Sequence, residues 1–286
     1  MALFSIITVC RNTEKTIKKT IESVLNQTFQ DYEYIVVDGA SKDSTFLIAQ
    51  SYDNRFSNIN IAYNRISEND LGIYNAMNKG IGLAKGQWLL FLNAGDSFCS
   101  NFVLEKFAEF VDENYDIIYG DAIHTFSNLY HYEKCLPLDK MTEKLPFCHQ
   151  SAFVSAELMR FCLYNENYKI AADFDFFLKC YLLKKKFLYV SLPVALFELG
   201  GISSSGNILR NIEHIQVLKE NDVISEEKYQ KEYSNLADCS RKYKRNSKLK
   251  QILPKWLLTK MRKFKCRKTG FNKINPAINS YKDIDK

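Results

Sequence analysis

Four short apolar runs divide the first 92 residues of the chain, and the segments between them carry apolar residues at helical spacing. The runs are rich in β-branched and aromatic residues, as buried strands are. They read FSIITVC (4–10), YEYIVVD (32–38), NINIAY (58–63) and QWLLFL (87–92). Strands that alternate with helices predict βαβ units, and therefore an α/β fold with a mostly parallel central sheet flanked by helices.

The segments between the runs predict helices. Ile17, Ile21 and Val24 recur at i, i+4 and i+7, which places them on one helical face. Asn12 or Thr13 is available as the N-cap of that helix. Further helices are predicted around residues 46–49 and over 72–84.

The second half of the chain is less regular. Strands are expected at 116–126 and near 130–134, helices at 155–162, 172–185 and about 207–221, an extended segment at 187–197 and a turn-rich loop at 200–206. Because no Pro-, Gly- or Ser-rich linker separates the halves, we expect one fused domain over 1–225 and a C-terminal extension over 226–286.

Composition and cysteine spacing narrow the class of protein. Hydrophobic residues make up 46% of the chain, and no uncharged apolar stretch approaches the ~20 residues that span a bilayer. The amino terminus, MALFSIITVCRN, has no basic region before its apolar run and does not resemble a signal peptide, so we expect a cytoplasmic protein. None of the eight cysteines forms C-x-x-C, so they are expected to be small core residues and not disulfides or zinc ligands.

Two common nucleotide-binding motifs are absent from the sequence. The first apolar run is followed by Arg11-Asn12-Thr13 and not by G-x-G-x-x-G, which argues against a dinucleotide-binding fold. No G-x-x-x-x-G-K-[ST] occurs, which excludes a P-loop.

Carboxylates at the predicted strand ends are the candidate ligand-binding residues, because ligands of parallel sheets bind beyond the carboxyl ends of the strands. They are Asp38, Asp70 and Asp96. Asp38 could accept a hydrogen bond from a base N–H, and Asp96 could hold a divalent ion that bridges phosphates. Taken singly, each of them also suits an ordinary turn or helix cap.

Seven motifs occur in a characteristic order over residues 3–205. They are ITVCRN, IVVDGASKDST, ENDLGIYNAMNKG, FLNAGD, PFCHQS, IAADFDFFLK and FELGGIS. Together they resemble the family 2 glycosyltransferases of the GT-A fold, in particular the bacterial enzymes that build O-antigen and capsular polysaccharides. The resemblance implies a Rossmann-like sheet, with a nucleotide-sugar-binding half over 1–98 and an acceptor-binding half over 99–225.

The resemblance also implies roles for individual residues. The nucleotide-sugar donor is expected to contact Thr8, Arg11, Asp38, Glu68, Asp70, Asn78, Lys79, Asn93 and His149. A Mn²⁺ or Mg²⁺ ion is expected at Asp96, in the family's D-x-D region, and Asp173 is expected to be the catalytic base.

The chain departs from the family pattern at this metal site. The D-x-D region reads Asn93-Ala94-Gly95-Asp96, which leaves Asp96 as the only carboxylate. A lone carboxylate can still hold Mg²⁺ or Mn²⁺, because such ions take many of their ligands from phosphate and water.

Asp173 and His149 each have a plainer interpretation. Asp173 opens a predicted helix, where an aspartate is a favoured N-cap and where the helix dipole would weaken it as a base. A single histidine among aromatic and cysteine residues is often just a satisfied, partly buried side chain. The family resemblance favours the base for Asp173. For His149 it makes a contact with the donor phosphates, the metal or the acceptor as favoured as the plain interpretation, and both stay open.

The C-terminal extension carries the basic character of the chain. Residues 241–268 contain 13 Lys or Arg and no Asp or Glu, while the whole chain has a net charge of only +6. Leu257, Met261 and Phe264 recur at i, i+4 and i+7 among these charges, and Trp256 lies near the start. A basic amphipathic helix of this kind favours the surface of an anionic membrane. The alternatives are a solvated helix packed on its own domain and, less favoured, a nucleic-acid contact.

These observations lead to a functional hypothesis. The protein is expected to be a glycosyltransferase, inverting by family resemblance, that moves a hexose or N-acetylhexosamine from a UDP-sugar to a polyprenyl-diphosphate-linked glycan at the inner face of the cell membrane. The alternatives are a transferase that acts on a soluble acceptor and a catalytically weak protein that only binds nucleotide sugars.

Overall fold

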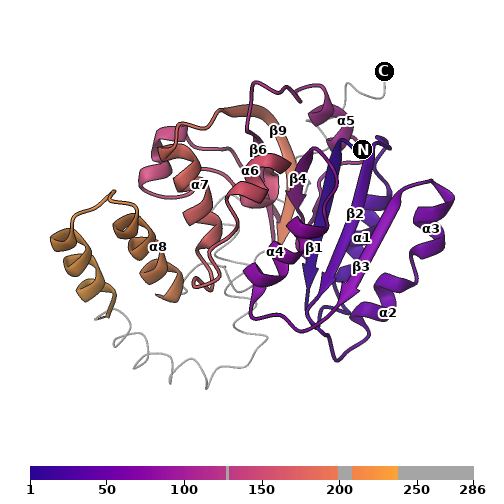
Figure 1. Ribbon diagram of the computed structural model, residues 1–286, viewed down its shortest axis with the longest axis horizontal. Coiled ribbons are helices and arrows are strands. Elements are labelled where there is room, and N and C mark those ends of the chain that lie inside the picture. The colour runs from indigo at the N-terminus through magenta and orange to yellow at the C-terminus, as the bar shows by residue number, and fades with distance from the viewer. Residues whose placement is uncertain (127–128, 199–207, 238–286) are drawn as a thin grey trace.

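A nine-stranded sheet forms the centre of the protein in its computed structural model, which describes residues 1–126, 129–198 and 208–237. The strand order is β3-β2-β1-β4-β8-β6-β9-β5, and β7 pairs with β6 outside this path. Helices cover both faces of the sheet (Figure 1). The predicted α/β fold class is confirmed.

The amino-terminal half alternates strands and helices as predicted. Its four strands are mutually parallel, in the order β3-β2-β1-β4. The elements are β1 (Phe4–Cys10), α1 (Ile17–Leu25), β2 (Tyr32–Asp38), α2 (Thr45–Gln50), α3 (Asp53–Asn58), β3 (Ala62–Ser67), α4 (Ile73–Leu83) and β4 (Trp88–Phe91).

Two local predictions in this half were wrong. The third strand begins at Ala62 and not at residue 58, because α3 extends to Asn58 and Asn60 then takes a positive φ of 58° in the turn that follows. The N-cap of α1 is Thr16, since Thr13 instead accepts the first turn's N–H groups through its backbone carbonyl. The residues that suit a turn or an N-cap also occur at the neighbouring positions, so the spacing of apolar residues does not fix where a helix begins or a turn lies.

The second half adds a mixed set of strands. β6 runs parallel to β9, whereas β8 is antiparallel to both β4 and β6, and β5 and β7 are also antiparallel to their partners. The sheet is therefore parallel throughout its first half and mixed in its second. The elements are β5 (Ser97–Phe98), α5 (Val103–Ala108), β6 (Ile117–Phe126), β7 (Leu129–Glu133), the 3₁₀ turns η1 (Leu138–Thr142) and η2 (His149–Ser151), β8 (Ala152–Ser155), α6 (Ala156–Phe161), α7 (Ala172–Leu182), β9 (Phe187–Glu198) and α8 (Ile208–Glu220).

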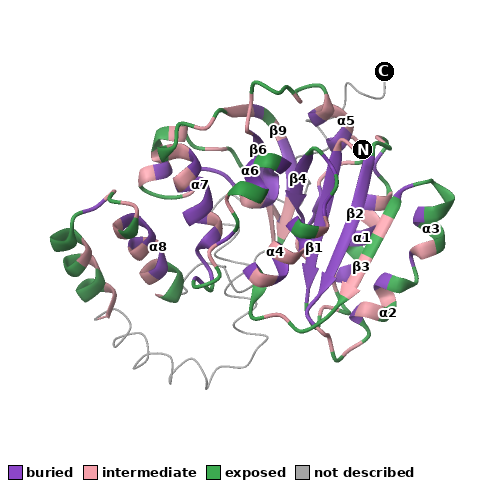
Figure 2. Cartoon of the chain, viewed as in Figure 1, coloured by how far each residue is buried: buried purple, intermediate pink, exposed green. Residues whose placement is uncertain are grey.

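Two hydrophobic cores lie on opposite faces of the sheet. Side chains alternate between the faces of a strand, so that Ile7 and Val9 of β1 enter one core while Phe4 and Ile6 enter the other. The first core is completed by α4, α6, α7 and α8, and the second by α1, α2, α3 and α5. Figure 2 shows the central strands buried between helices whose outer surfaces are exposed.

The extension begins as a helix over residues 226–237. Lys219 of α8 pairs with Glu226 at 2.9 Å and lies over the Tyr229 ring, so this helix packs against α8. The basic segment 241–268 and the loop 200–206 lie outside the described residues. Within the described ranges, no helix is both long and apolar enough to cross a membrane, and the six cysteines there are free thiols.

Candidate active site

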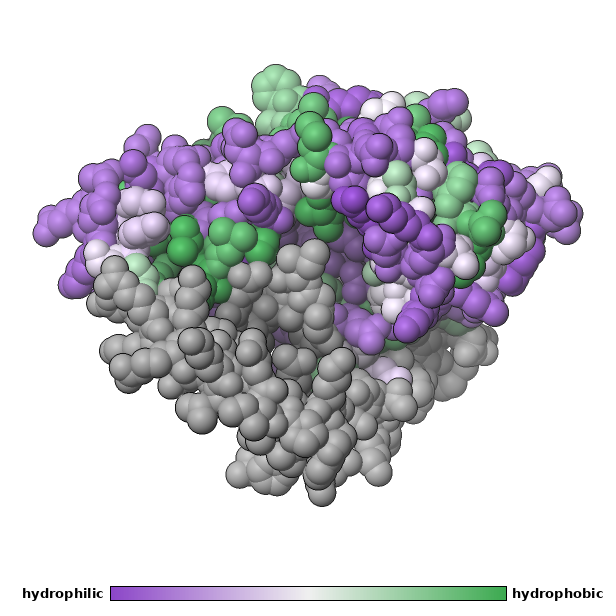
Figure 3. Space-filling model, turned by 90° about the horizontal axis from the view of Figure 1, so that it is seen from below, coloured by the Kyte–Doolittle hydropathy of each residue, from purple (hydrophilic) through white to green (hydrophobic). Residues whose placement is uncertain are grey.

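Strands β1, β2 and β4 end at the same edge of the sheet. The turn after β4 stays beside β1, because the N–H of Leu92 donates to Ile7 and that of Ala94 to Val9. The parallel strands run downward in Figure 1, so their carboxyl ends lie on the face seen in Figure 3, whose described part is mostly hydrophilic. The predicted common edge is thus present, and ligand binding at it stays a prediction.

Asp96 lies in the turn after β4 and is only 6% exposed. Its Oδ2 accepts a hydrogen bond from Gln150 Nε2 at 3.0 Å, and its Oδ1 accepts one from the N–H of Glu198 at 3.2 Å. Burial raises the pKa of Asp96 to about 6, against the opposing effect of these donors. The side chain therefore joins the turn after β4 to η2 and to the end of β9.

Asn93 opens the same turn and faces His149. Its Nδ2 lies 3.5 Å from His149 Nε2, and its Oδ1 is buried without a hydrogen-bond partner. A buried acceptor that lacks a protein donor is costly to leave unpaired. Asn93 Oδ1 is therefore suited to receive a hydrogen bond from a ligand.

Asp173 lies in the first turn of α7 and points at the same region. Its Oδ2 is 3.2 Å from His149 Nδ1, and its Oδ1 accepts from Tyr74 Oη at 3.1 Å and from the N–H of Phe174 at 2.9 Å. Burial alone would raise the pKa of Asp173, but the His149 contact and these two donors together hold the pKa below its usual value. Asp173 is therefore a stable carboxylate.

The PFCHQS segment connects the two carboxylates. Within η2, His149 faces Asp173 on α7 while the next residue, Gln150, donates to Asp96 in the turn after β4. One 3₁₀ turn thus carries contacts to both. The structure brings Asn93, Asp96, His149 and Asp173 together, as the sequence motifs predicted.

The turn around Asp96 offers a divalent ion one carboxylate and no cluster of protein ligands among the described residues. Among the described residues, no three His, Cys, Asp or Glu side chains form a group that could hold a metal ion. Asp96 is the only carboxylate of the turn, and both its oxygens already accept hydrogen bonds, although each oxygen can accept a further contact. The donor set fits a cation held mainly by diphosphate and water, with Asp96 as its single protein carboxylate.

Arg11, Gly39 and Asp70 form the opposite border of the edge. Arg11 Nη1 lies 4.0 Å from Asp70 Oδ1, and the Arg11 side chain is 58% exposed, so its guanidinium is accessible to an anion. A Cβ on Gly39 would lie 2.0 Å from Asp70 Oδ2. Glycine at position 39 is therefore what allows the Asp70 carboxylate to pack against the end of β2.

Thr8 and Asp38, which were predicted to contact the nucleotide, are fully buried and already hydrogen-bonded within the protein. The Thr8 hydroxyl donates to a backbone carbonyl of the turn after β4 and accepts from Tyr34. Asp38 accepts hydrogen bonds from the backbone and side chain of Ser41 and from Ser67. Direct donor contact stays a prediction for both, and for Asp38 it requires a base N–H to replace a serine hydroxyl.

Asn78, Lys79 and Glu68 hold the loops around α4. The Asn78 amide donates to the backbone of Tyr164 and to Glu166, and it accepts from the N–H of Tyr164. Lys79 pairs with Glu68 at 2.8 Å and donates to the backbone of the loop before α4. The structure shows these side chains bracing loops, and their predicted contacts with the donor stay predictions.

Three residues of the site were missed by sequence reasoning. Tyr74 and Gln150 lie inside recognised motifs, but their partners are 99 and 54 residues away in the chain. Glu213 on α8 accepts hydrogen bonds from the backbone just before α7, and no sequence signal marks it.

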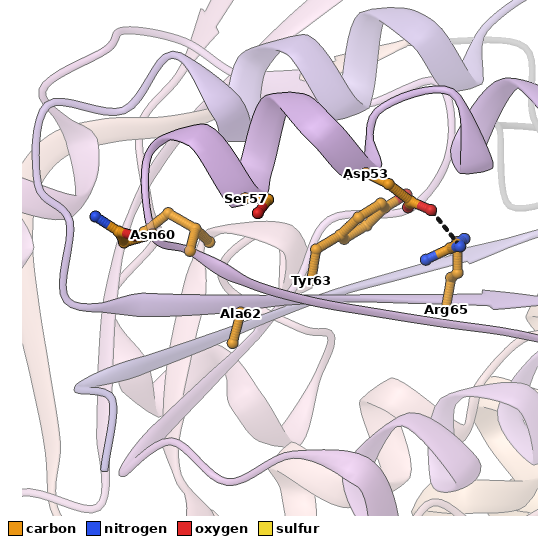
Figure 4. A pocket seen from close by; sticks show the side chains of 7 residues that line it. Asp53, Ser57, Asn60, Ala62, Tyr63 and Arg65 are labelled. Carbon is orange, nitrogen blue, oxygen red and sulfur yellow. Dashed lines mark hydrogen bonds and ion pairs between the residues drawn. The ribbon is translucent and has the colours of Figure 1, made fainter.

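A separate cavity of about 400 Å³ lies between α3 and β3. Tyr63 and the ion-paired Asp53 and Arg65 line it (Figure 4). None of the predicted site residues contributes to its walls, so the cavity is distinct from the candidate site.

Comparison with solved structures identifies the class of fold as GT-A. The S. aureus TarS 1–349 structure in complex with UDP-GlcNAc matches with a TM-score of 0.62 and 20% identity, over 83% of this chain and 71% of that one. The mannosyltransferase PcManGT from Pyrobaculum calidifontis, in complex with GDP-Man and Mn²⁺, matches with a TM-score of 0.60 and 14% identity, over 82% and 69%. The longer TarS chain is matched over 43% of its length. At these identities the likeness establishes the fold alone.

Comparison of sequences narrows the class to one family. Residues 5–170 match glycosyl transferase family 2, and the chain belongs to this family and is a glycosyltransferase. A PGL/p-HBAD biosynthesis glycosyltransferase of Mycobacterium bovis is 33% identical over 209 residues, which are 71% of this chain and 80% of the relative. The predicted family, fold and enzyme class are confirmed.

Proposed function

We propose that the protein moves a hexose or N-acetylhexosamine from a UDP-sugar, with inversion, to a polyprenyl-diphosphate-linked glycan of a bacterial surface polysaccharide, either O antigen or capsule. The observation that carries this proposal is the set of contacts from Asn93 through His149 to Asp173, because it joins the donor-side turn to a carboxylate of the second half. The UDP-GlcNAc complex of a protein with the same fold supports the donor class.

The chemistry requires a proton acceptor on the acceptor side of the sugar. As the acceptor hydroxyl attacks the anomeric carbon, the bond from that carbon to the diphosphate breaks, and the hydroxyl proton must be taken up by a positioned base. Asp173 and His149 form the pair placed for this role at the amino-terminal end of α7, where Asp173 Oδ2 lies 3.2 Å from His149 Nδ1. Inversion follows when attack and departure occur on opposite faces of the sugar.

The donor is proposed to lie across the strand-end turn. Arg11 presents its exposed guanidinium to an anion there, and Asn93 Oδ1 can accept a hydrogen bond from a donor hydroxyl. A Mn²⁺ or Mg²⁺ ion at Asp96, when bound, would neutralise the negative charge that develops on the departing diphosphate.

The acceptor and the location of the protein belong to the same proposal. We expect the basic segment 241–268 to contact an anionic membrane surface, which would keep the protein peripheral on the inner face of the cell membrane near a lipid-linked acceptor. Nucleic acid is not an expected partner.

The test is transfer by the full-length protein. UDP-hexoses and UDP-N-acetylhexosamines are screened with Mn²⁺ or Mg²⁺ and a polyprenyl-diphosphate sugar, and both UDP release and the extended glycolipid are measured. UDP release should depend on the acceptor, and Asp173→Asn should lower the transfer rate by about 10²–10⁴-fold. Asp139→Asn, at an exposed site on η1, is the control and should leave the rate unchanged.

One observation favours a second candidate. Because both oxygens of Asp96 already accept protein hydrogen bonds, the site could bind a nucleotide sugar with little turnover. UDP binding without turnover on any acceptor would refute the main proposal and support this alternative. Turnover only on a free oligosaccharide would indicate a soluble acceptor.

A further inference from the structure

A second cavity lies between α8 and the helix over residues 226–237. Its volume is about 320 Å³, at the lower end of the roughly 300–1,000 Å³ of small-molecule sites. The match to the family ends at residue 170, so the cavity is formed entirely by the part of the chain that follows. The described residues that line it are Asn211, His214, Ile215, Glu232, Asn235 and Leu236.

His214 connects this cavity to the start of α7. Its imidazole stacks on the Phe174 ring with the ring centroids 4.1 Å apart, and Phe174 directly follows Asp173 in the chain. α8 lies between α7 and the helix 226–237 (Figure 1). Asp173 itself does not line the cavity. A ligand bound there would therefore lie close to the proposed base without touching it.

The lining side chains match a sugar better than an anion. The amides of Asn211 and Asn235 can donate and accept hydrogen bonds, and the Glu232 carboxylate can accept them, so together they suit hydroxyl groups. Ile215 and Leu236 offer apolar contact to the C–H groups of a sugar ring. Of the described residues that line the cavity, none is a Lys or Arg that could pair with a phosphate. Asn235 is exposed, so a ligand can enter from solvent.

His214 adds a buried polar atom that lacks a partner. Its Nε2 has no hydrogen-bond partner in the protein, which is costly for a buried group. Burial and the charge of Arg210 lower the pKa of the imidazole to about 4, against the opposing charge of Asp173. Near pH 7 the ring is therefore neutral and has one donor and one acceptor nitrogen. A sugar hydroxyl can pair with either.

We propose that this cavity binds a sugar unit of the acceptor glycan, next to the unit that receives the new sugar. The acceptor then contains at least two sugars, and the enzyme extends a glycan instead of starting one. An earlier glycosyl transfer must supply this substrate. The cavity positions the acceptor and takes no part in bond formation, so Asp173 keeps its proposed role as the base. This inference rests on the proposed transferase activity.

Sugar binding can be measured without turnover. The full-length protein, labelled at its Ile and Leu methyl groups, is titrated by NMR with free hexoses, N-acetylhexosamines and their disaccharides, and separately with inorganic phosphate and octanoate. The Ile215 methyl signal, assigned from Ile215→Val, should shift with at least one sugar. Ile61, which lines the cavity between α3 and β3, is the control and should not shift. The inference is overturned if no sugar shifts Ile215, or if phosphate or octanoate shifts it as strongly.

Transfer kinetics test the cavity with the acceptor itself. Asn235→Ala should raise the KM for a polyprenyl-diphosphate disaccharide by about two- to tenfold, the loss expected for one hydrogen bond, with little change in the KM for the UDP-sugar. Ser234→Ala is the matched control, because Ser234 is exposed on the same helix but does not line the cavity. Its kinetics should equal those of the wild type.

The outcomes separate this inference from the proposed function. If transfer occurs and Asn235→Ala has the same acceptor KM as Ser234→Ala, the inference is overturned and the transferase remains. If sugars shift Ile215 but no acceptor is extended, the failure lies in the proposed function and the sugar site remains.

Discussion

Replacing Glu213 by alanine should strongly destabilise the protein. Glu213 is on α8 and is 6% exposed. Its carboxylate accepts hydrogen bonds from three consecutive backbone N–H groups, those of Lys169 (3.0 and 3.1 Å), Ile170 (2.8 Å) and Ala171 (3.0 Å). These groups immediately precede α7, whose N-cap, Ala171, has no side chain that could satisfy them.

The magnitude follows from what alanine would leave unpaired. Ile170 and Ala171 are 7% and 3% exposed, so water cannot readily replace the lost acceptor there, whereas the exposed Lys169 can be hydrated. A buried donor without a partner costs about 1–3 kcal/mol, so the two together cost roughly 2–6 kcal/mol. Loss of an anion near a helix N-terminus adds about 0.3–1 kcal/mol. We expect Glu213→Ala to lower the free energy of unfolding by roughly 2–7 kcal/mol, a large part of the usual 5–15 kcal/mol.

The assay is urea denaturation in reducing buffer, followed by tryptophan fluorescence and circular dichroism. Glu213→Gln should lose less, because its amide oxygen still accepts some of these hydrogen bonds. Glu226→Ala removes an exposed acid that pairs with Lys219 of α8 from the following helix, and as the control it should change stability by less than about 1 kcal/mol. A loss below about 1 kcal/mol for Glu213→Ala would show that the N–H groups find other acceptors, and would refute this reasoning.

Three further predictions concern other parts of the chain. Burial of His214, which stacks on Phe174, lowers the pKa of its imidazole to about 4. Because the unfolded chain binds this proton near pH 6.5, the free energy of unfolding should fall by up to about 3 kcal/mol as the pH drops from 6.5 to 4. Denaturation of His214→Phe at the same pH values should lack this part of the pH dependence. Gly39→Ala would force the Asp70 carboxylate away and should weaken UDP binding at least about tenfold, equal to about 1.4 kcal/mol, as measured by calorimetry. The control is Gly82→Ala, whose Cβ would meet nothing within 4 Å and which should leave UDP binding unchanged. Removing 241–286 should reduce sedimentation with anionic vesicles while transfer to a detergent-dispersed acceptor persists; unaltered sedimentation would contradict a membrane role for the tail.

Much of the fold could be predicted because its strands are locally encoded. β1, β2 and β4 are buried at every position and mostly apolar, and the helix α4 has apolar residues at the right period. The predicted position of β3 was wrong because β3 is an edge strand in which no residue is buried. The buried Ile61, which precedes the strand, lies in the turn and drew the prediction toward it. Periodicity reports burial, and it fails where a loop residue is buried and a strand is not.

The site was predictable as a set of residue types but not as a set of contacts. Asp173, His149 and Asp96 could be proposed because they lie in recognisable motifs. That Asp173 would be bonded to Tyr74, and Asp96 to Gln150, depends on packing between segments far apart in the chain. The same reason explains Asn78, whose motif suggested a donor contact but whose amide is occupied by the loop at 164–166. Local sequence carries no record of such distant partners.

The antiparallel direction of β8 is what assembles the site. β8 is antiparallel to β4, with Trp88 opposite Ser155 and Leu89 opposite Val154. The residues that precede β8 must therefore lie beside the residues that follow β4, and those are η2, with His149 and Gln150, and the turn with Asn93 and Asp96. A parallel strand in this place would put η2 at the other end of the sheet. Neither the Asn93–His149 contact nor the hydrogen bond from Gln150 to Asp96 could form there. The direction of β8 is thus a requirement for the joint site in this protein.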